Sequence, residues 1–259
     1  MKKRKDSMFF APRNKETALG MYTPLYFIAL AVCIILIIVG LILSRKMNKK
    51  QVYKTLVIIG IFLWITEIIK MIFYFVTYGL EDVDFIPLYF CSMYMYASAL
   101  IMFKNEKLKN TGLSFMFFGG IIGAIVFFCY PSACVPNYPL FHYMTLRTFI
   151  YHSLMIYAGF LIVITGYYKP NVKYFVHYSI FLGITFILAY ILNIVFEDDL
   201  MYIMKPIKIA ISQNAYNWNP TLYPFIVGIL EIVGPFWATY FIYWLVMKIK
   251  NINKKAENV

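Results

Sequence analysis

Seven apolar stretches occupy most of the 259-residue chain, and each is long enough to cross a lipid bilayer. A transmembrane helix needs about 20 mostly apolar residues, because the hydrocarbon core is about 30 Å thick and each residue adds about 1.5 Å. Hydrophobic residues make up 62% of the sequence, well above the usual share in soluble domains. We therefore predict an all-α fold, a polytopic transmembrane helical bundle with seven transmembrane helices. The predicted spans are 22–43, 52–78, 85–103, 111–130, 145–167, 174–196 and 222–247.

Short connections between the spans leave no room for a sizeable soluble domain. We divide the chain into a basic N-terminal tail at 1–21, a seven-helix transmembrane domain at 22–247 and a basic tail at 248–259. The formal net charge of +12 arises mainly from basic residues near the ends of the spans. That placement is typical of topology signals and of contacts with lipid headgroups, and it argues against a nucleic-acid-binding protein.

The basic residues are distributed unequally between the two sides of the predicted bundle. Fourteen lie in three loops and the C-terminal tail on one side, whereas the opposite loops hold only Arg147, Lys205 and Lys208. The positive-inside rule then places the C-terminus in the cytoplasm, and seven spans place the N-terminus outside. The basic N-terminal tail favours the opposite side for that end, but most of its charges lie far from the first span. We expect a multi-pass protein of the cell membrane.

Polar side chains inside the spans are the best candidates for a functional site, because a charge in the hydrocarbon core is costly. They all fall in the outward half of their spans, although successive helices run in opposite directions. We therefore predict one polar pocket that opens toward the outer leaflet. Its candidate residues are Glu67, Lys70, Tyr89, Cys91, His152, Asn193 and Glu231.

Each candidate also has a purely structural interpretation. Glu67 and Lys70 are three residues apart on one helical face, so they could form an ion pair that holds the bundle together. Asn193 could bond to a neighbouring helix, and Glu231 could satisfy a group freed at the break formed by Gly234 and Pro235. A buried cysteine is most often a packing residue. The sequence leaves these alternatives open.

The combination of Cys91 and His152 adds a chemical interpretation. A thiol is mostly protonated at neutral pH, and a neighbouring imidazole can accept its proton to give a thiolate nucleophile. A carboxylate such as Glu67 or Glu231 could orient the imidazole, as in a catalytic triad. A pocket at the depth of lipid ester bonds would suit acyl transfer on a phospholipid. We expect membrane lipids as partners, with no cofactor and no metal.

Short motifs along the chain also carry a resemblance. The segment from Phe85 to Cys91 resembles an LPLHLC element at the start of a third helix, and the segment from Arg147 to His152 resembles a helix with a paired-histidine element. Together with similar fourth, sixth and closing helices, they occur in the order found in the YwaF-like bacterial integral membrane proteins. These are relatives of the eukaryotic transmembrane-protein-164 family. The resemblance covers roughly residues 60–247.

The resemblance implies a possible activity. Eukaryotic members look like acyltransferases that move a fatty acyl group onto ether lysophospholipids through a cysteine and a histidine, which match Cys91 and His152. This chain departs from the family pattern at Tyr89 and Tyr151, where the family usually has histidines. The alternative function is that of a non-enzymatic membrane binding or transport protein for a lipid or small solute.

The connection at 197–221, between the last two spans, is long for a loop in a compact bundle. Its aromatic residues Tyr202, Tyr216 and Trp218 suit the membrane interface. The stretch from Ile207 to Ile211 could form a short amphipathic helix. We predict that this connection folds back over the outward pocket; an interfacial anchor beside the bundle is the alternative.

Overall fold

The computed structural model of the protein describes residues 8–79, 85–132, 134–207 and 210–256, and all regular structure within these ranges is helical. Six helices within these ranges are long and apolar enough to cross a membrane. The predicted all-α, polytopic transmembrane fold is therefore confirmed. The six spans are Pro24–Ser44, Lys49–Tyr78, Glu106–Cys129, Tyr143–Ile164, Val172–Phe196 and Tyr223–Lys250.

The stretch predicted as the third span, 85–103, forms only short helices. The 3₁₀ helix η3 (Phe90–Ser92) leads directly into α3 (Met93–Leu100). At about 1.5 Å per residue this helical run covers about 16 Å, roughly half of the hydrocarbon thickness. The predicted count of seven transmembrane helices is therefore not confirmed.

The helices group into two compact units, each assembled from segments that are separated in the sequence. The first unit contains Met1–Pro87 and Gly123–Thr165, and the second contains Leu88–Ile122 and Gly166–Val259. The division of the chain into two tails and one membrane domain stays a prediction.

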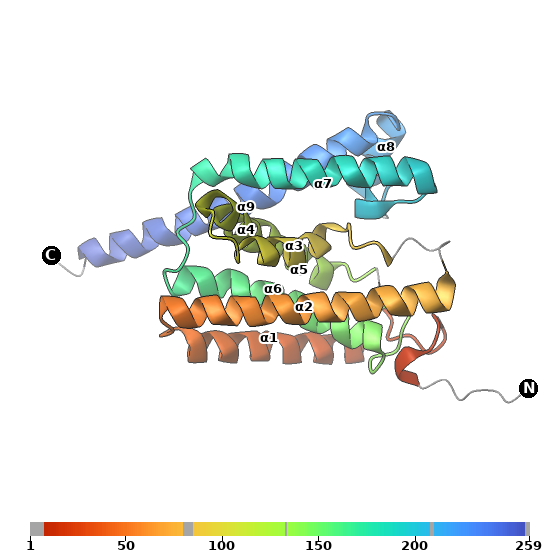
Figure 1. The fold of residues 1–259 in the computed structure, drawn as a ribbon, viewed down its shortest axis with the longest axis horizontal. Coiled ribbons are helices and arrows are strands. Elements are labelled where there is room, and N and C mark those ends of the chain that lie inside the picture. The colour runs from red at the N-terminus through yellow and green to blue at the C-terminus, as the bar shows by residue number, and fades with distance from the viewer. Residues whose placement is uncertain (1–7, 80–84, 133, 208–209, 257–259) are drawn as a thin grey trace, which may run out of the picture. The chain divides into compact units, whose positions relative to one another are not determined.

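The first unit is built on α1 (Pro24–Ser44), α2 (Lys49–Tyr78) and α6 (Tyr143–Ile164), with α6 contacting both of the others (Figure 1). The ends of these helices are fixed by side-chain caps. Asn48 and Gln51 form a reciprocal capping box at the start of α2, which satisfies backbone N–H groups that have no partner within the helix. His142 caps α6, since its Nδ1 accepts a hydrogen bond from the Met144 N–H at 3.1 Å.

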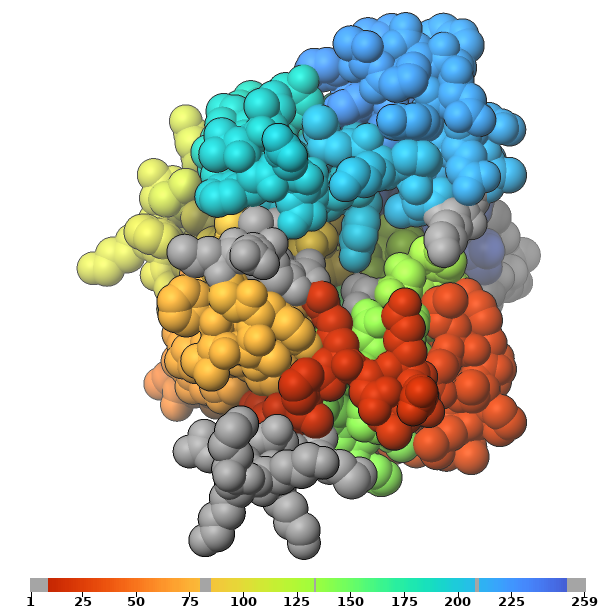
Figure 2. All heavy atoms as spheres, turned by 90° about the vertical axis from the view of Figure 1, so that its right-hand side faces the viewer, coloured from red at the N-terminus to blue at the C-terminus, as the bar shows by residue number. Residues whose placement is uncertain are grey.

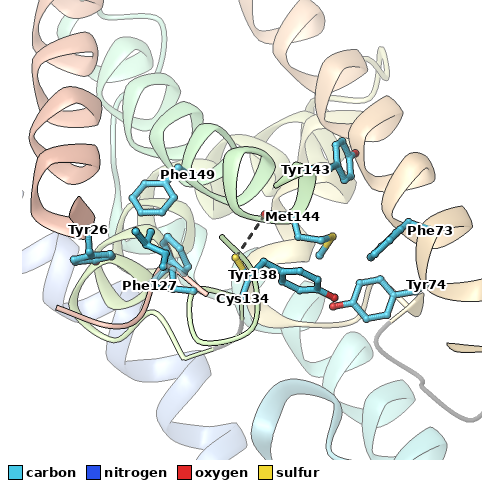
Figure 3. Close-up of a cluster of buried hydrophobic side chains, with 11 residues drawn as sticks. Tyr26, Phe73, Tyr74, Phe127, Cys134, Tyr138, Tyr143, Met144 and Phe149 are labelled. Carbon is cyan, nitrogen blue, oxygen red and sulfur yellow. Dashed lines mark hydrogen bonds between the residues drawn. The ribbon is translucent and has the colours of Figure 1, made fainter. Parts of the chain in front are cut away.

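An aromatic cluster forms the core at one end of the first unit. It includes Tyr26, Phe73, Phe127 and Tyr138, and the Cys134 thiol within it donates to the Met144 carbonyl at 3.5 Å (Figure 3). The cluster is held by connections as well as helices: the N–H of Leu19 donates to the Tyr138 carbonyl at 2.9 Å. The N–H of Arg13 donates to the Tyr78 hydroxyl at 2.7 Å, so the segment around Arg13 lies beside the end of α2, where Figure 2 shows red atoms next to orange ones.

The second unit contains α3, α4 (Glu106–Ser114), α7 (Phe175–Phe196), α8 (Ala210–Trp218) and α9 (Tyr223–Ala256). A π-helical turn, η4 (Phe115–Gly119), joins α4 to α5 (Gly120–Cys129), whose last residues belong to the first unit. The rings of Phe118 and Phe236 pack with centroids 4.0 Å apart, and the Thr239 hydroxyl donates to the Phe118 carbonyl at 3.2 Å. The π-helical turn is thus packed against α9.

Candidate functional site

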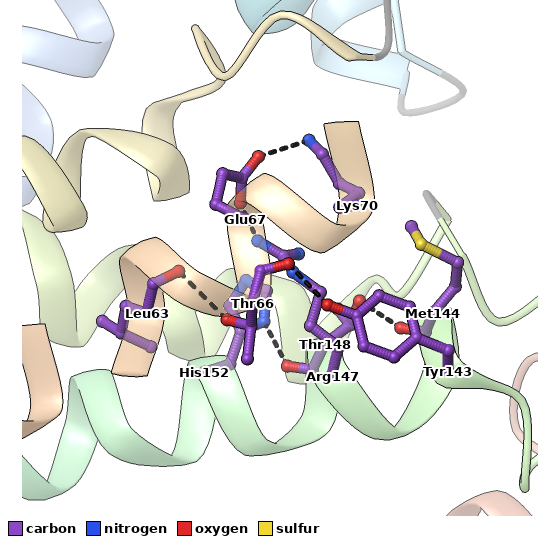
Figure 4. A network of polar contacts seen from close by, with 9 residues as sticks. All are labelled: Leu63, Thr66, Glu67, Lys70, Tyr143, Met144, Arg147, Thr148 and His152. Carbon is purple, nitrogen blue, oxygen red and sulfur yellow. Dashed lines mark hydrogen bonds and ion pairs between the residues drawn. The ribbon is translucent and has the colours of Figure 1, made fainter. Parts of the chain in front are cut away.

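A buried charge cluster joins α2 to α6 in the first unit (Figure 4). Glu67 is fully buried, and its Oε1 lies 2.6 Å from the Nζ of Lys70 on the same helix. Its other oxygen, Oε2, pairs with an Nη of Arg147 from α6. The predicted ion pair between Glu67 and Lys70 is therefore confirmed, and Arg147 is an additional member. We call these three residues the charge triad.

Arg147 falls within the predicted span 145–167, and counting it with the loop residues in the charge comparison is wrong. It lies one turn inside α6, and its side chain is only 10% exposed. Its guanidinium carbon lies 4.9 Å from the centre of the Tyr151 ring, one helical turn further on. Its Nε is buried and has no hydrogen-bond partner among the described residues. The nearby Tyr143 hydroxyl donates to the Thr66 carbonyl of α2 at 2.5 Å, which fixes the two helices together.

His152 lies on the same helix as Arg147 and is almost fully buried. Its Nδ1 lies 2.7 Å from the Thr148 carbonyl oxygen, one turn back along α6. A carbonyl oxygen can only accept, so Nδ1 carries the hydrogen and Nε2 carries the lone pair. The imidazole also stacks on Phe127, with centroids 3.9 Å apart and planes 14° from parallel. The ring orientation and the tautomer of His152 are therefore both fixed.

Cys91 lies in the second unit, in the first turn of the helical run that η3 and α3 form. The N-terminal end of a helix carries a partial positive charge, which favours a thiolate. Burial of the Cys91 thiol opposes the thiolate most strongly, and the negative charge of Glu231, from α9, opposes it further. Ionisation of Cys91 therefore needs a group that accepts the proton.

Glu231 forms a second polar group in the second unit. Its Oε2 is buried without a hydrogen-bond partner among the described residues, and so is the hydroxyl of Tyr178 on α7. The two side chains interact electrostatically. Glu231 also lies one turn before Pro235, which interrupts the backbone hydrogen bonding of α9.

Asn193 has a local role in the structure. Its side-chain amide donates to the Leu200 carbonyl at 3.0 Å and accepts from the Leu200 N–H at 2.6 Å. These two bonds close the turn that follows α7, where Glu197 adopts a left-handed conformation with φ of 55°. The bonds that the structure gives to Asn193 therefore serve this turn and are not the expected interhelical bonds.

The connection after α7 packs on residues next to Cys91. Leu200, Met201 and Ile203 are buried, and the ring of Tyr202 lies 5.3 Å from that of Tyr89, two residues before Cys91. Burial raises the pKa of Asp199 in this connection above its ordinary value, although backbone N–H groups such as that of Met204 donate to its carboxylate and lower it.

The helix α8 occupies Ala210–Trp218, so it overlaps only the end of the short helix expected from Ile207 to Ile211. The Ser212 hydroxyl lies 2.7 Å from the Tyr223 hydroxyl, which joins α8 to the start of α9. Part of the expected stretch, 208–209, lies outside the described residues. Coverage of an outward pocket by this connection stays a prediction.

The candidate residues thus fall into two groups. The first unit holds Glu67, Lys70 and His152, together with Arg147. The second unit holds Tyr89, Cys91, Asn193 and Glu231. A direct pairing of Cys91 with His152, and a single pocket shared by all seven candidates, stay predictions.

Comparison with known proteins identifies the family. The model of the TMEM164 family matches residues 19–247, most of the chain. The chain belongs to the TMEM164 family. The resemblance drawn from short motifs is therefore confirmed for the transmembrane-protein-164 family, and the YwaF-like relationship is compatible with it. No curated protein and no solved structure matches the chain.

Three residues of the site are not among the predicted candidates. Thr148 fixes the His152 tautomer, Arg147 completes the charge triad, and Tyr178 lies near Glu231. Helical spacing could have indicated the bond to Thr148, which lies four residues before His152, but not the pairing of Arg147 with Glu67, 80 residues away. Tyr178 carried no signal, because a tyrosine in an apolar helix looks like ordinary packing.

Proposed function

We propose that this member of the TMEM164 family transfers a fatty acyl group between membrane lipids, with Cys91 as the nucleophile and His152 as the proton acceptor. The observation that carries the proposal is the 2.7 Å contact between His152 Nδ1 and the Thr148 carbonyl oxygen. Because Nδ1 holds its hydrogen for that bond, Nε2 is the nitrogen that can take a proton from a thiol.

The proposed reaction has two halves. In the first, Nε2 of His152 accepts the Cys91 proton, and the sulfur attacks the ester carbonyl of a donor lipid. The ester C–O bond breaks, the leaving alkoxide takes the proton from the imidazolium, and a thioester remains on Cys91. In the second, the hydroxyl of a lysophospholipid gives its proton to His152 and attacks the thioester, which regenerates the thiol.

The environment of Cys91 supports the need for such a base. Burial and the neighbouring Glu231 charge both oppose the thiolate, and the first turn of a helix favours it only modestly. The sulfur therefore stays protonated until a base removes its proton. Tyr202 packs on Tyr89 beside this turn and would limit the access of water, which favours transfer of the acyl group over its hydrolysis.

The proposal also includes an orientation, with the C-terminus in the cytoplasm and the N-terminus outside. Termini on opposite sides require an odd number of crossings, so the orientation includes the segment 85–103, with its short helices, as a seventh crossing. The excess of basic residues near the cytoplasmic ends supports it, and moving Arg147 into α6 reduces the basic count of the opposite loops further. A tag after Val259 should be protected from protease in intact cells, and one before Met1 should be cleaved. An accessible C-terminal tag would reverse the orientation.

The experiment that tests the activity uses the protein in lipid nanodiscs with a donor phospholipid that carries a labelled acyl chain and a lysophospholipid acceptor. Cys91→Ala should abolish transfer. His152→Gln should lower the rate by about 10²-fold to 10⁴-fold, the range for loss of a general base. Cys33→Ala and His177→Ala change the same residue types elsewhere and should leave the rate nearly unchanged. Full activity of Cys91→Ala would reject the mechanism.

A non-enzymatic lipid or solute binding protein is the second candidate. The observation that favours it is the pair of buried polar atoms without hydrogen-bond partners among the described residues, on Glu231 and Tyr178. A bound ligand would satisfy them. In that case the nanodisc assay would show saturable lipid binding without turnover, and Glu231→Gln would weaken the binding while Cys91→Ala would not.

A further inference from the structure

We propose that Arg147, held by Glu67, forms a binding site for the phosphate group of a membrane lipid. The site lies in the first unit and uses none of the groups assigned to the chemistry. The inference deepens the proposed function, because it assigns a phosphate-bearing headgroup to the lipid that the protein acts on. Binding at this site does not require Cys91, so it can be measured separately from turnover.

Glu67 is shared between two cations. Its Oε1 pairs with Lys70, so only Oε2 is left for Arg147. A single carboxylate oxygen cannot satisfy all five N–H donors of a guanidinium. Arg147 therefore keeps donors for a second acceptor, such as a phosphate oxygen.

The geometry of the Arg147 guanidinium suits a phosphate. Arginine has five N–H donors in a planar fork, which matches two oxygens of a phosphate. The contact with Glu67 fixes one corner of the fork, and the Tyr151 ring lies 4.9 Å from the guanidinium carbon. Nε is buried and has no hydrogen-bond partner among the described residues. The side chain is nine-tenths buried, so an oxygen atom of a ligand would accept the hydrogen bond of Nε that no described residue accepts.

The charge triad lies in the half of α2 that is farther from its basic start. Lys70 is 16 residues beyond Lys54 and eight residues before Tyr78, the last residue of the helix. At ~1.5 Å per residue the triad is therefore about 12 Å from that end of the helix. The acyl chain of a lipid can carry its phosphate to this depth, whereas a free anion would have to leave water to reach it.

The test compares lipids that differ only in the phosphate. Purified protein with Cys91→Ala, which cannot form the thioester, is titrated with oleoyl lysophosphatidic acid or with monooleoylglycerol, and bound lipid is counted by native mass spectrometry. We expect the phosphate-bearing lipid to bind at least tenfold more tightly. Arg147→Lys keeps the positive charge but loses the planar fork of donors. It should weaken the binding of the phosphate-bearing lipid about tenfold and leave the binding of monooleoylglycerol unchanged. Arg45→Lys, at an exposed position after α1, is the matched control.

Equal affinity of the two lipids would overturn the proposal even if Arg147→Lys did not fold, because that comparison needs no change at Arg147. Displacement of the lipid by millimolar inorganic phosphate would assign the site to a free anion and overturn the lipid as its source. The proposed function has a different outcome that would contradict it: the wild-type protein binds the phosphate-bearing lipid more tightly but transfers no acyl group.

Discussion

Replacing Glu67 with glutamine tests the charge triad, because it removes the carboxylate that pairs with both Lys70 and Arg147. Glu67 is fully buried, and the two basic side chains are 8% and 10% exposed. Removing one partner of a buried ion pair costs about 3–5 kcal/mol, because the remaining charge is left without compensation. A protein of this size loses about 2–4 °C in melting temperature per kcal/mol. We therefore expect Glu67→Gln to lower the melting temperature by about 6–20 °C.

The chain offers a matched control for this substitution. Glu106 and Lys109 are also three residues apart on one helix, but their ion pair is 3.7 Å long and the Glu106 side chain is 75% exposed. Exposed pairs contribute about 0–1 kcal/mol, so Glu106→Gln should change the melting temperature by at most about 4 °C. The two variants make the same chemical change, one at a buried carboxylate with two basic partners and one at an exposed carboxylate with one.

Thermal unfolding in one detergent, followed by tryptophan fluorescence, measures both variants. Glu67→Asp keeps the charge on a shorter side chain and should fall between the wild type and Glu67→Gln. If Glu67→Gln unfolds within the range of Glu106→Gln, the charge triad is hydrated like a surface pair, and the argument from burial is wrong.

Two further predictions concern a pH-sensitive cap and a close helix contact. Burial lowers the pKa of His142, whose Nδ1 accepts a hydrogen bond from the Met144 N–H. As the pH falls, the unfolded chain therefore binds a proton at this histidine before the folded protein does. The free energy of unfolding should then decrease as the pH drops below about 6.5. His142→Asn keeps an N-cap acceptor, so its unfolding temperature should depend less on pH between 7.5 and 5.5. A side chain at Gly120 would meet the buried Tyr94 ring at 2.6 Å, so Gly120→Ala should cost about 1–3 kcal/mol in thermal unfolding. Gly183, which has nothing within 4 Å, is the control, and Gly183→Ala should be neutral or slightly stabilising; equal effects would contradict the packing argument.

Hydropathy predicted the spans well where one helix crosses the apolar layer alone. The predicted spans differ by only a few residues from the bounds of four helices, α1, α2, α6 and α7. The length and the caps of a membrane helix depend on residues within the helix and next to it, so the local sequence predicts them. Hydropathy failed at 85–103, where Pro87 and the following residues stay irregular until Phe90. Composition alone cannot distinguish a full transmembrane helix from a short helix preceded by an irregular apolar segment.

The candidate site was only partly predictable, for a physical reason. The pair of Glu67 and Lys70 follows from helical spacing within one segment, and the structure has it. The partner Arg147 lies 80 residues from Glu67, and no local pattern reports which helices meet. Asn193 shows the converse, since a polar residue near a helix end can serve the local turn instead of a pocket.

The most direct test of the central claim is to detect the thioester on Cys91. The protein is incubated with the donor phospholipid alone, without an acceptor, then digested and measured by mass spectrometry. The account predicts an acyl group on the peptide that contains Cys91, released by neutral hydroxylamine, absent from the peptides of Cys33 and Cys129, and strongly reduced in His152→Gln. An unmodified Cys91 in a preparation that transfers acyl groups, or equal acylation of all three cysteines, would contradict it.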